Sequence, residues 1–265
     1  MDDVDDIDGV EIEQNNLDYV DMENGFAYLP CAAHNFQLVL KDGFKLDKVY
    51  DDLLKRVTAM VGKSKKSSVV AEQLREFDKF LSKSVITRWN SILFLVRSIL
   101  KINKDELQQI RNNLPTKTKS QQKTKDLFRL SQIDRVMLDE LRNLLVLFEF
   151  VTNELQTNEV SISRVYPCYL YLQSNLTKDM DTYKYTKQMR KDLLTSLEKR
   201  FGELVREIDI FMLSTMLDPN FGKGAIPRSE LCLAMARLKD RLIKNSSRPI
   251  VIPENENKNS SSSEK

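Results

Sequence analysis

The single histidine of the chain lies three residues after a cysteine, and this pair could take part in metal binding. Cys31 and His34 stand in the stretch CAAHNFQLVLKDGF, and both side chains are common zinc ligands. A zinc site needs about four ligands. The other two cysteines, Cys168 and Cys232, stand apart within helical patterns, where they resemble small core residues. We therefore expect no bound metal.

Nucleophilic catalysis is the second chemistry that Cys31 and His34 could support. Residues three apart share one face of a helix, so the imidazole could reach the thiol. No glycine-rich turn that could stabilise an oxyanion follows the pair, and a half-buried histidine that anchors the start of a helix is the simpler reading. The chain also lacks a P-loop, a G-x-G-x-x-G stretch and an H-E-x-x-H stretch. We assign no catalytic residue and expect no cofactor and no small-molecule substrate.

The only tryptophan belongs to a second informative stretch, SVITRWNSILFL (84–95). Thr87 can cap a helix that begins at Arg88 or Trp89. A guanidinium can hold a phosphate through two hydrogen bonds, and an indole can stack on a base, so Arg88 and Trp89 could clamp an unstacked nucleotide. In the alternative reading, Trp89 is an apolar anchor of the helix and Arg88 is exposed.

Charge is unevenly distributed along the chain. Residues 1–24 carry ten acidic residues and no Lys or Arg, so the remaining chain holds 41 basic against 29 acidic residues, a net charge of +12. A basic body suits a polyanionic partner such as DNA, although lysines that only solvate helix faces would give the same count. We expect an acidic disordered linker over 1–25, a folded body over 26–245 and a disordered polar tail over 246–265.

The elements that position these residues are predicted to be helices. Only seven glycines and seven prolines occur, which is few for a sheet-rich fold. Apolar residues recur at helical spacing from Phe36 onward, with Gly43 as a plausible helix stop. Longer patterns predict helices over 46–61, 70–81, 89–110, 132–156, 160–176, 187–206 and 229–244. One short strand is expected over 26–31, an exposed loop over 113–126 and a turn over 218–224.

Three scattered cysteines suit a reducing compartment, and no apolar run is long enough to predict a transmembrane helix.

Five motifs in order resemble those of the hAT superfamily of DNA transposases and its domesticated relatives, including the zinc-finger BED-type proteins. They cover about residues 26–226. In this sequence the motifs read CAAHNFQLVLKDGF, TRWNSILFLVRSIL, LLVLFEFVTNEL, VYPCYLYLQSNL and STMLDPNFGKG. The resemblance implies a fold that is mainly α: the helical insertion of a ribonuclease-H-like core, with at most one or two short strands near the N-terminus. The body over 26–245 would then be a fragment of that core.

The resemblance also implies a role in DNA binding. Family members use three acidic residues to hold divalent metal, and no residue here matches them, so we expect no transposase activity. The residues that match DNA-contacting positions of the family are Arg88, Trp89, Cys31 and His34. We therefore expect a truncated, catalytically inactive, nuclear protein that retains DNA binding. The alternative is a helical module that binds a protein partner, or a second copy of itself, through exposed helix faces.

Overall fold

The computed structural model of the chain describes residues 31–45, 48–82, 89–156, 162–202, 204–205 and 209–246. Every regular element in these residues is a helix, so the predicted mainly α class is confirmed. The strand expected over 26–31 lies outside the described residues except for Cys31, which is not in a strand. The predicted acidic linker lies outside them too, as does the polar tail except Ser246, the last residue of the final helix.

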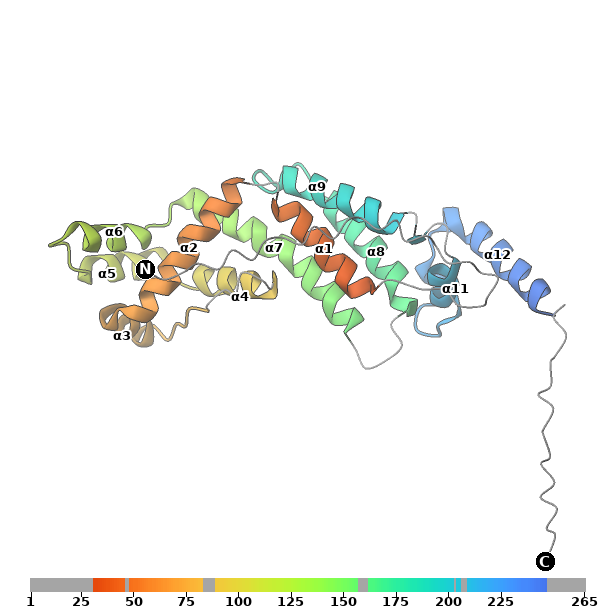
Figure 1. The fold of residues 1–265 in the computed structure, drawn as a ribbon, viewed down its shortest axis with the longest axis horizontal. Helices are drawn as coiled ribbons and strands as arrows, with labels where there is room; N and C mark the ends of the chain where they lie inside the picture. Colours follow the sequence, from red (N-terminus) through yellow and green to blue (C-terminus); the bar gives the residue numbers. More distant parts are fainter. Residues whose placement is uncertain are drawn as a thin grey trace, which may run out of the picture.

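A long central helix, α7 (Gln132–Leu155), organises the molecule. Its 24 residues span about 36 Å at 1.5 Å per residue. One face of α7 is buried along its length, because apolar residues recur there at helical spacing. Three helices pack around it: α1 (Ala32–Lys45), α4 (Trp89–Leu100) and α8 (Ile162–Thr177) (Figure 1). The helices predicted over 132–156 and 160–176 are thus confirmed.

The start of α7 is fixed by a capping box and by an ion pair to another helix. The Ser131 hydroxyl accepts a hydrogen bond from the Asp134 backbone N–H at 3.1 Å, and the Asp134 carboxylate accepts from the Ser131 N–H at 2.8 Å. Arg56 of α2 (Lys48–Lys66) also pairs with Asp134. Burial acts to raise the pKa of Asp134, but the hydrogen bonds from Ser131 and Arg56 outweigh it and lower the pKa. The charged carboxylate therefore joins α2 to α7.

Helix α9 (Lys187–Leu197) covers α1 and α8, and a π-helical turn, Glu198–Gly202, continues it. The close contact of α1 with α9 depends on Gly43. A Cβ atom added to Gly43 would lie 2.5 Å from Cδ2 and 2.7 Å from Cγ of Leu193. The expectation that Gly43 ends its helix is wrong, since α1 continues to Lys45. The glycine serves close packing of two helices instead.

Two further contacts hold α1 against the π-helical turn. The rings of Phe36 and Phe201 stack with centroids 4.0 Å apart. The Asp42 carboxylate accepts hydrogen bonds from the Arg200 guanidinium at 2.8 and 3.0 Å and from the Ser196 hydroxyl at 2.8 Å. The motif CAAHNFQLVLKDGF therefore supplies contacts to the core, as the apolar face predicted for its helix indicates.

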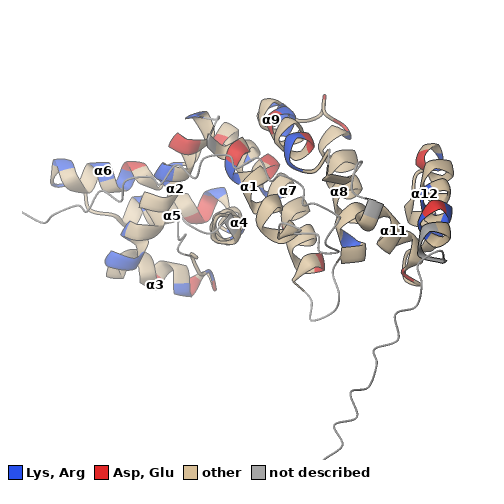
Figure 2. Cartoon of the chain, turned by 45° about the vertical axis from the view of Figure 1, so that its right-hand side comes forward, with Lys and Arg blue, Asp and Glu red and all other residues tan. Residues whose placement is uncertain are grey.

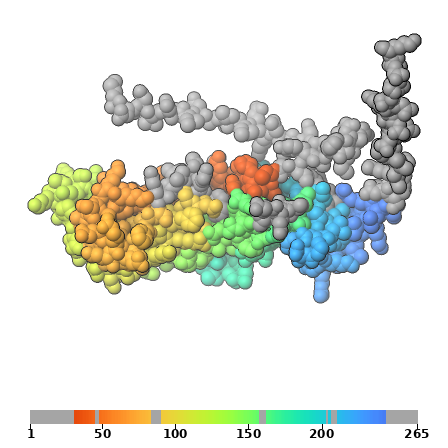
Figure 3. Space-filling model, turned by 90° about the horizontal axis from the view of Figure 1, so that it is seen from below, coloured from red at the N-terminus to blue at the C-terminus, as the bar shows by residue number. Residues whose placement is uncertain are grey.

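Four helices form a second group at one end of the molecule, which we call the basic lobe. They are α2 (Lys48–Lys66), α3 (Ser68–Glu76), α5 (Lys104–Asn113) and α6 (Lys119–Leu127). Helix α2 packs against α3 and α6, and α3 packs against α5. The lobe lies at the left end of the elongated molecule in Figure 1, and the side view in Figure 3 shows the same elongation.

The sequence predictions for the lobe and the adjoining α4 need four corrections. Helix α2 runs through Gly62 to Lys66, because Gly62 is exposed and imposes no turn. The helix predicted over 89–110 is two helices, since a capping box of Asn103 and Glu106 starts α5 anew. The loop predicted over 113–126 contains α6, whose start is capped by Thr118. The helix predicted over 70–81 is also shorter: α3 ends at Glu76, before Asp78 with its positive φ of 53°.

The other end of the molecule is formed by α11 (Asp209–Leu217), a short 3₁₀ helix (Gly222–Ala225) and α12 (Arg228–Ser246). Helix α11, which was not predicted, packs on α8. The turn predicted at Asp218 is present, and the Asp218 carboxylate accepts a hydrogen bond from the Asn220 backbone N–H at 2.8 Å. Helix α12 confirms the one predicted over 229–244 and packs on α11.

Candidate nucleic-acid interface

Cys31 and His34 lie at the N-terminal end of α1, and both side chains are exposed. Within the described residues, no group of three or more His, Cys, Asp or Glu side chains is placed to hold a metal ion. The basic lobe begins beyond the opposite end of α1, and the 14 residues of that helix span about 21 Å. The structure therefore does not bring Cys31 and His34 to the lobe.

The predicted Arg88–Trp89 clamp falls largely outside the described residues. Arg88 is not described, and Trp89 is described only as the first backbone position of α4. Helix α4 packs on α7 and also contacts α1. The Ser82 backbone N–H donates to the Ser98 hydroxyl at 3.1 Å, which ties the segment after α3 to α4. The two predicted DNA-contacting motifs thus belong to neighbouring helices, but how their side chains meet stays a prediction.

The positive charge of the chain is concentrated in one segment. Residues 48–130, which contain the basic lobe and α4, carry 19 Lys and Arg against 8 Asp and Glu, a net charge of +11. Residues 131–246 carry 17 basic and 16 acidic residues. Nearly all of the +12 predicted for the body is therefore carried by this segment of the sequence, and Figure 2 shows Lys and Arg recurring along α2, α3 and α6 at one end of the molecule.

Many cations of the lobe are exposed and available to a ligand. Ten exposed examples are Lys63, Lys65, Lys66, Arg75, Lys101, Lys104, Lys117, Lys119, Lys123 and Arg129. In the part of the chain that the structure describes, none of these ten forms an ion pair with Asp or Glu. Their charges are not neutralised locally, so they add to a field that attracts polyanions.

Helix α6 presents Lys119 and Lys123 to solvent, and none of its side chains is buried. A capping box fixes its start: the Thr118 hydroxyl accepts from the Gln121 backbone N–H at 3.2 Å, and the Gln121 side chain accepts from the Thr118 N–H at 3.1 Å. The T-x-x-Q spacing is the signal that could have predicted this helix. The spacing of apolar residues could not predict this helix, because the segment is polar almost throughout.

The exposed cations of this arrangement are suited to contact with phosphates. Exposed Lys and Arg on four packed helices can contact several phosphates of one strand, and such contacts supply affinity that is independent of sequence. The resemblance motifs lie outside the four helices of the basic lobe. Several of their side chains are buried in the core, among them Leu144 and Phe148 of α7, Tyr166 of α8 and Thr215 of α11.

None of the helices in the described part of the chain is both long enough and apolar enough to cross a membrane. Comparison of the chain with protein-family models found no matching family, and comparison with curated proteins found no matching relative.

Proposed function

We propose that this chain binds DNA through the basic lobe without cleaving it. The observation that carries the proposal is the net charge of +11 on residues 48–130, where ten exposed cations form no ion pair with Asp or Glu in the described structure. Duplex DNA carries one negative charge per about 1.7 Å of axis, so an elongated basic surface can neutralise several phosphates at once. The resemblance to hAT transposases supports the same partner and suggests that the protein acts in the nucleus.

Salt dependence of binding tests the role of the lobe. Fluorescence anisotropy with a labelled duplex, repeated over a range of salt concentrations, gives the number of phosphate contacts, because each contact contributes about −0.9 to the slope of log K against log salt. The variant Lys119→Glu/Lys123→Glu removes two exposed charges from α6, where no side chain is buried. We expect weaker binding to every sequence and a slope reduced by about 2.

A matched control separates the lobe from general electrostatics. Lys191→Glu/Lys199→Glu makes the same charge change at two exposed positions outside the lobe. This control should bind DNA with nearly the slope of the parent chain. If both double variants lose affinity equally, net charge alone explains binding and the lobe is not the interface.

The predicted clamp is tested by the form of the DNA. Arg88→Ala and Trp89→Ala should weaken binding to a hairpin or to single-stranded DNA and leave duplex binding unchanged, because only an unpaired base can stack on the indole. Loss of one such stack costs about 1–3 kcal/mol. Equal affinities of parent and variants for every DNA form would remove the clamp from the proposal and leave the lobe untouched.

Self-association is the second candidate function, and α12 favours it. Leu233 and Met235 of this helix are both exposed, with Leu233 at 49%. A second copy of the chain is the occupant we consider, because a two-fold dimer can pair the same apolar helix from each copy. Light scattering coupled to size-exclusion chromatography tests this candidate. A dimer that Leu233→Glu converts to a monomer supports it, and a monomeric parent chain rejects it.

A further inference from the structure

A buried arginine of α9 points to a site that lies outside the basic lobe. Arg190 is only 1% exposed and is the largest of the fully buried side chains. Its Nη1 donates to the Asn175 backbone oxygen at 3.0 Å, and its guanidinium lies 3.6 Å from the centre of the Tyr183 ring. Its Nε has no hydrogen-bond partner. A buried cation with an unsatisfied donor is costly unless something compensates it.

No carboxylate neutralises this guanidinium directly. Among the described residues, Arg190 forms no ion pair with Asp or Glu. Glu140 of α7 is near enough to favour the charged form, but its carboxylate accepts hydrogen bonds from the backbone N–H groups of residues 184–186. Burial, the largest influence, lowers the pKa of Arg190. An arginine nonetheless stays protonated in proteins, so the positive charge persists.

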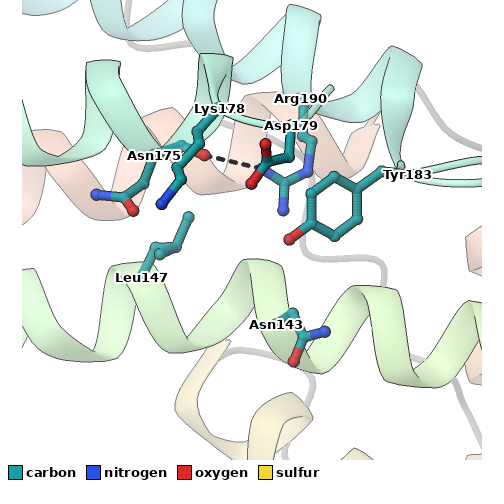
Figure 4. Close-up of a pocket in the computed structure, with 7 residues that line it drawn as sticks. All are labelled: Asn143, Leu147, Asn175, Lys178, Asp179, Tyr183 and Arg190. Atoms are coloured by element: carbon teal, nitrogen blue, oxygen red, sulfur yellow. Dashed lines mark hydrogen bonds between the residues drawn. The ribbon is translucent and has the colours of Figure 1, made fainter. Parts of the chain in front are cut away.

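The guanidinium borders a cavity of about 160 Å³ between α7, α8 and the start of α9. Figure 4 shows the guanidinium and the Tyr183 ring above α7, with Lys178 on the other side of the same space. The polar side chains that line the cavity are Asn143, Asn175, Lys178, Asp179, Tyr183 and Arg190. Two cations against one carboxylate leave the lining with a net positive charge.

We propose that this cavity binds a single phosphate group. At about 30 Å³ for each water, the volume equals roughly five waters, and a phosphate ion has five non-hydrogen atoms. A guanidinium is suited to phosphate because its planar N–H groups can donate to two oxygens at once. The Lys178 ammonium supplies a second positive charge at the rim. The phosphate could be inorganic or part of a phosphomonoester, since both present the same oxygens.

Thermal unfolding of the full chain tests the site with inorganic phosphate as the probe. A ligand that binds only the folded state raises the melting temperature as its concentration exceeds Kd. We expect phosphate, and not chloride at equal ionic strength, to raise it. Adenosine monophosphate forms the second arm of the test. If it binds more tightly than inorganic phosphate, the natural ligand is a phosphomonoester. If it binds more weakly, the site takes the free ion.

Two variants at the rim decide the proposal without disturbing the buried arginine. Lys178 and Asp179 are both exposed. Lys178→Gln should weaken phosphate binding by about tenfold, through loss of one charge-assisted hydrogen bond, whereas Asp179→Asn should strengthen it by removing repulsion. Lys199→Gln, at an exposed position outside the cavity, should respond like the parent chain.

Three outcomes would overturn the site: no phosphate-specific stabilisation of the parent chain, equal phosphate responses in all variants, or loss of stability in Asp179→Asn without tighter binding. The last result would mean that Asp179 is the internal partner of Arg190. Because neither rim residue belongs to the basic lobe, both variants should keep the DNA affinity of the parent chain. Failure of this site is therefore distinguishable from failure of the proposed DNA binding.

Discussion

Replacing Gly43 by alanine tests whether the close approach of α1 and α9 fixes the central fold. The added Cβ would lie 2.5 Å from Cδ2 and 2.7 Å from Cγ of Leu193, about 1 Å inside ordinary carbon contact. Leu193 is fully buried, and the Cγ contact means that the whole side chain must move. Overpacking of this kind costs about 1–3 kcal/mol, and we expect the upper end of that range here.

The helix preference of alanine over glycine offsets about 1 kcal/mol of this cost. The net expectation for Gly43→Ala is a loss of about 2 kcal/mol, which corresponds to a melting temperature lower by about 4–8 °C for a chain of this size. Denaturant and thermal unfolding followed by circular dichroism measure both quantities.

Gly62→Ala is the matched control for this substitution. Gly62 lies in the interior of α2, and an added Cβ would meet no atom within 4 Å. The same chemical change should therefore stabilise the chain there by roughly 0.5–1 kcal/mol. In a Leu193→Ala background, Gly43→Ala should also become neutral or stabilising, because the clash is gone. A stable Gly43→Ala chain, or a cost that persists without Leu193, would refute the packing argument.

Three further predictions follow from local contacts. Asp134→Asn should destabilise the chain by about 1–2 kcal/mol at pH 7. The folded pKa of Asp134 is lowered, so its contribution is present above the unfolded value of about 3.9 and is lost as the pH falls through the folded pKa. The free energies of unfolding of parent and variant should therefore begin to converge only below about pH 3.9 and should meet below the folded pKa. A colorimetric thiol reagent should modify Cys31 and Cys232 rapidly in the native chain and Cys168 only after denaturation, because burial raises the pKa of the Cys168 thiol to about 12. Asp78→Gly should stabilise the chain by about 1 kcal/mol in urea unfolding, since Asp78 closes α3 with a φ of 53° that costs an L-residue energy.

The sequence predicts best the elements whose apolar residues are regular and buried. Helix α7 was predicted within one residue of its observed end, because its apolar spacing is continuous and decides the helix without help from its neighbours. Helix α6 was missed because it buries no side chain, so only its T-x-x-Q capping box marks it. The break between α4 and α5 was likewise marked by a capping box, at Asn103 and Glu106, rather than by any change of period.

Other features depend on neighbours that local sequence does not reveal. Gly43 and Gly62 are both helical glycines, yet one faces Leu193 and the other faces open space. No local pattern separates them. The burial of Arg190 is equally hidden, since an arginine within a helical pattern is expected on the surface. The DNA-contacting residues predicted from the resemblance are positioned only in part, because Arg88 lies outside the described residues.

Substitutions of buried motif residues and substitutions of exposed cations should have different effects. The resemblance motifs contribute core side chains, such as Phe148 of α7 and Thr215 of α11, whose hydroxyl donates to the Ser163 backbone oxygen at 2.7 Å. The basic lobe contributes exposed cations, and these need only the helices that carry them. Substitution of Phe148 or Thr215 should therefore change the free energy of unfolding, whereas substitution of Lys119 or Lys123 should change DNA affinity at constant stability. The proposed DNA-binding surface should thus tolerate substitution without a change in the core that supports it.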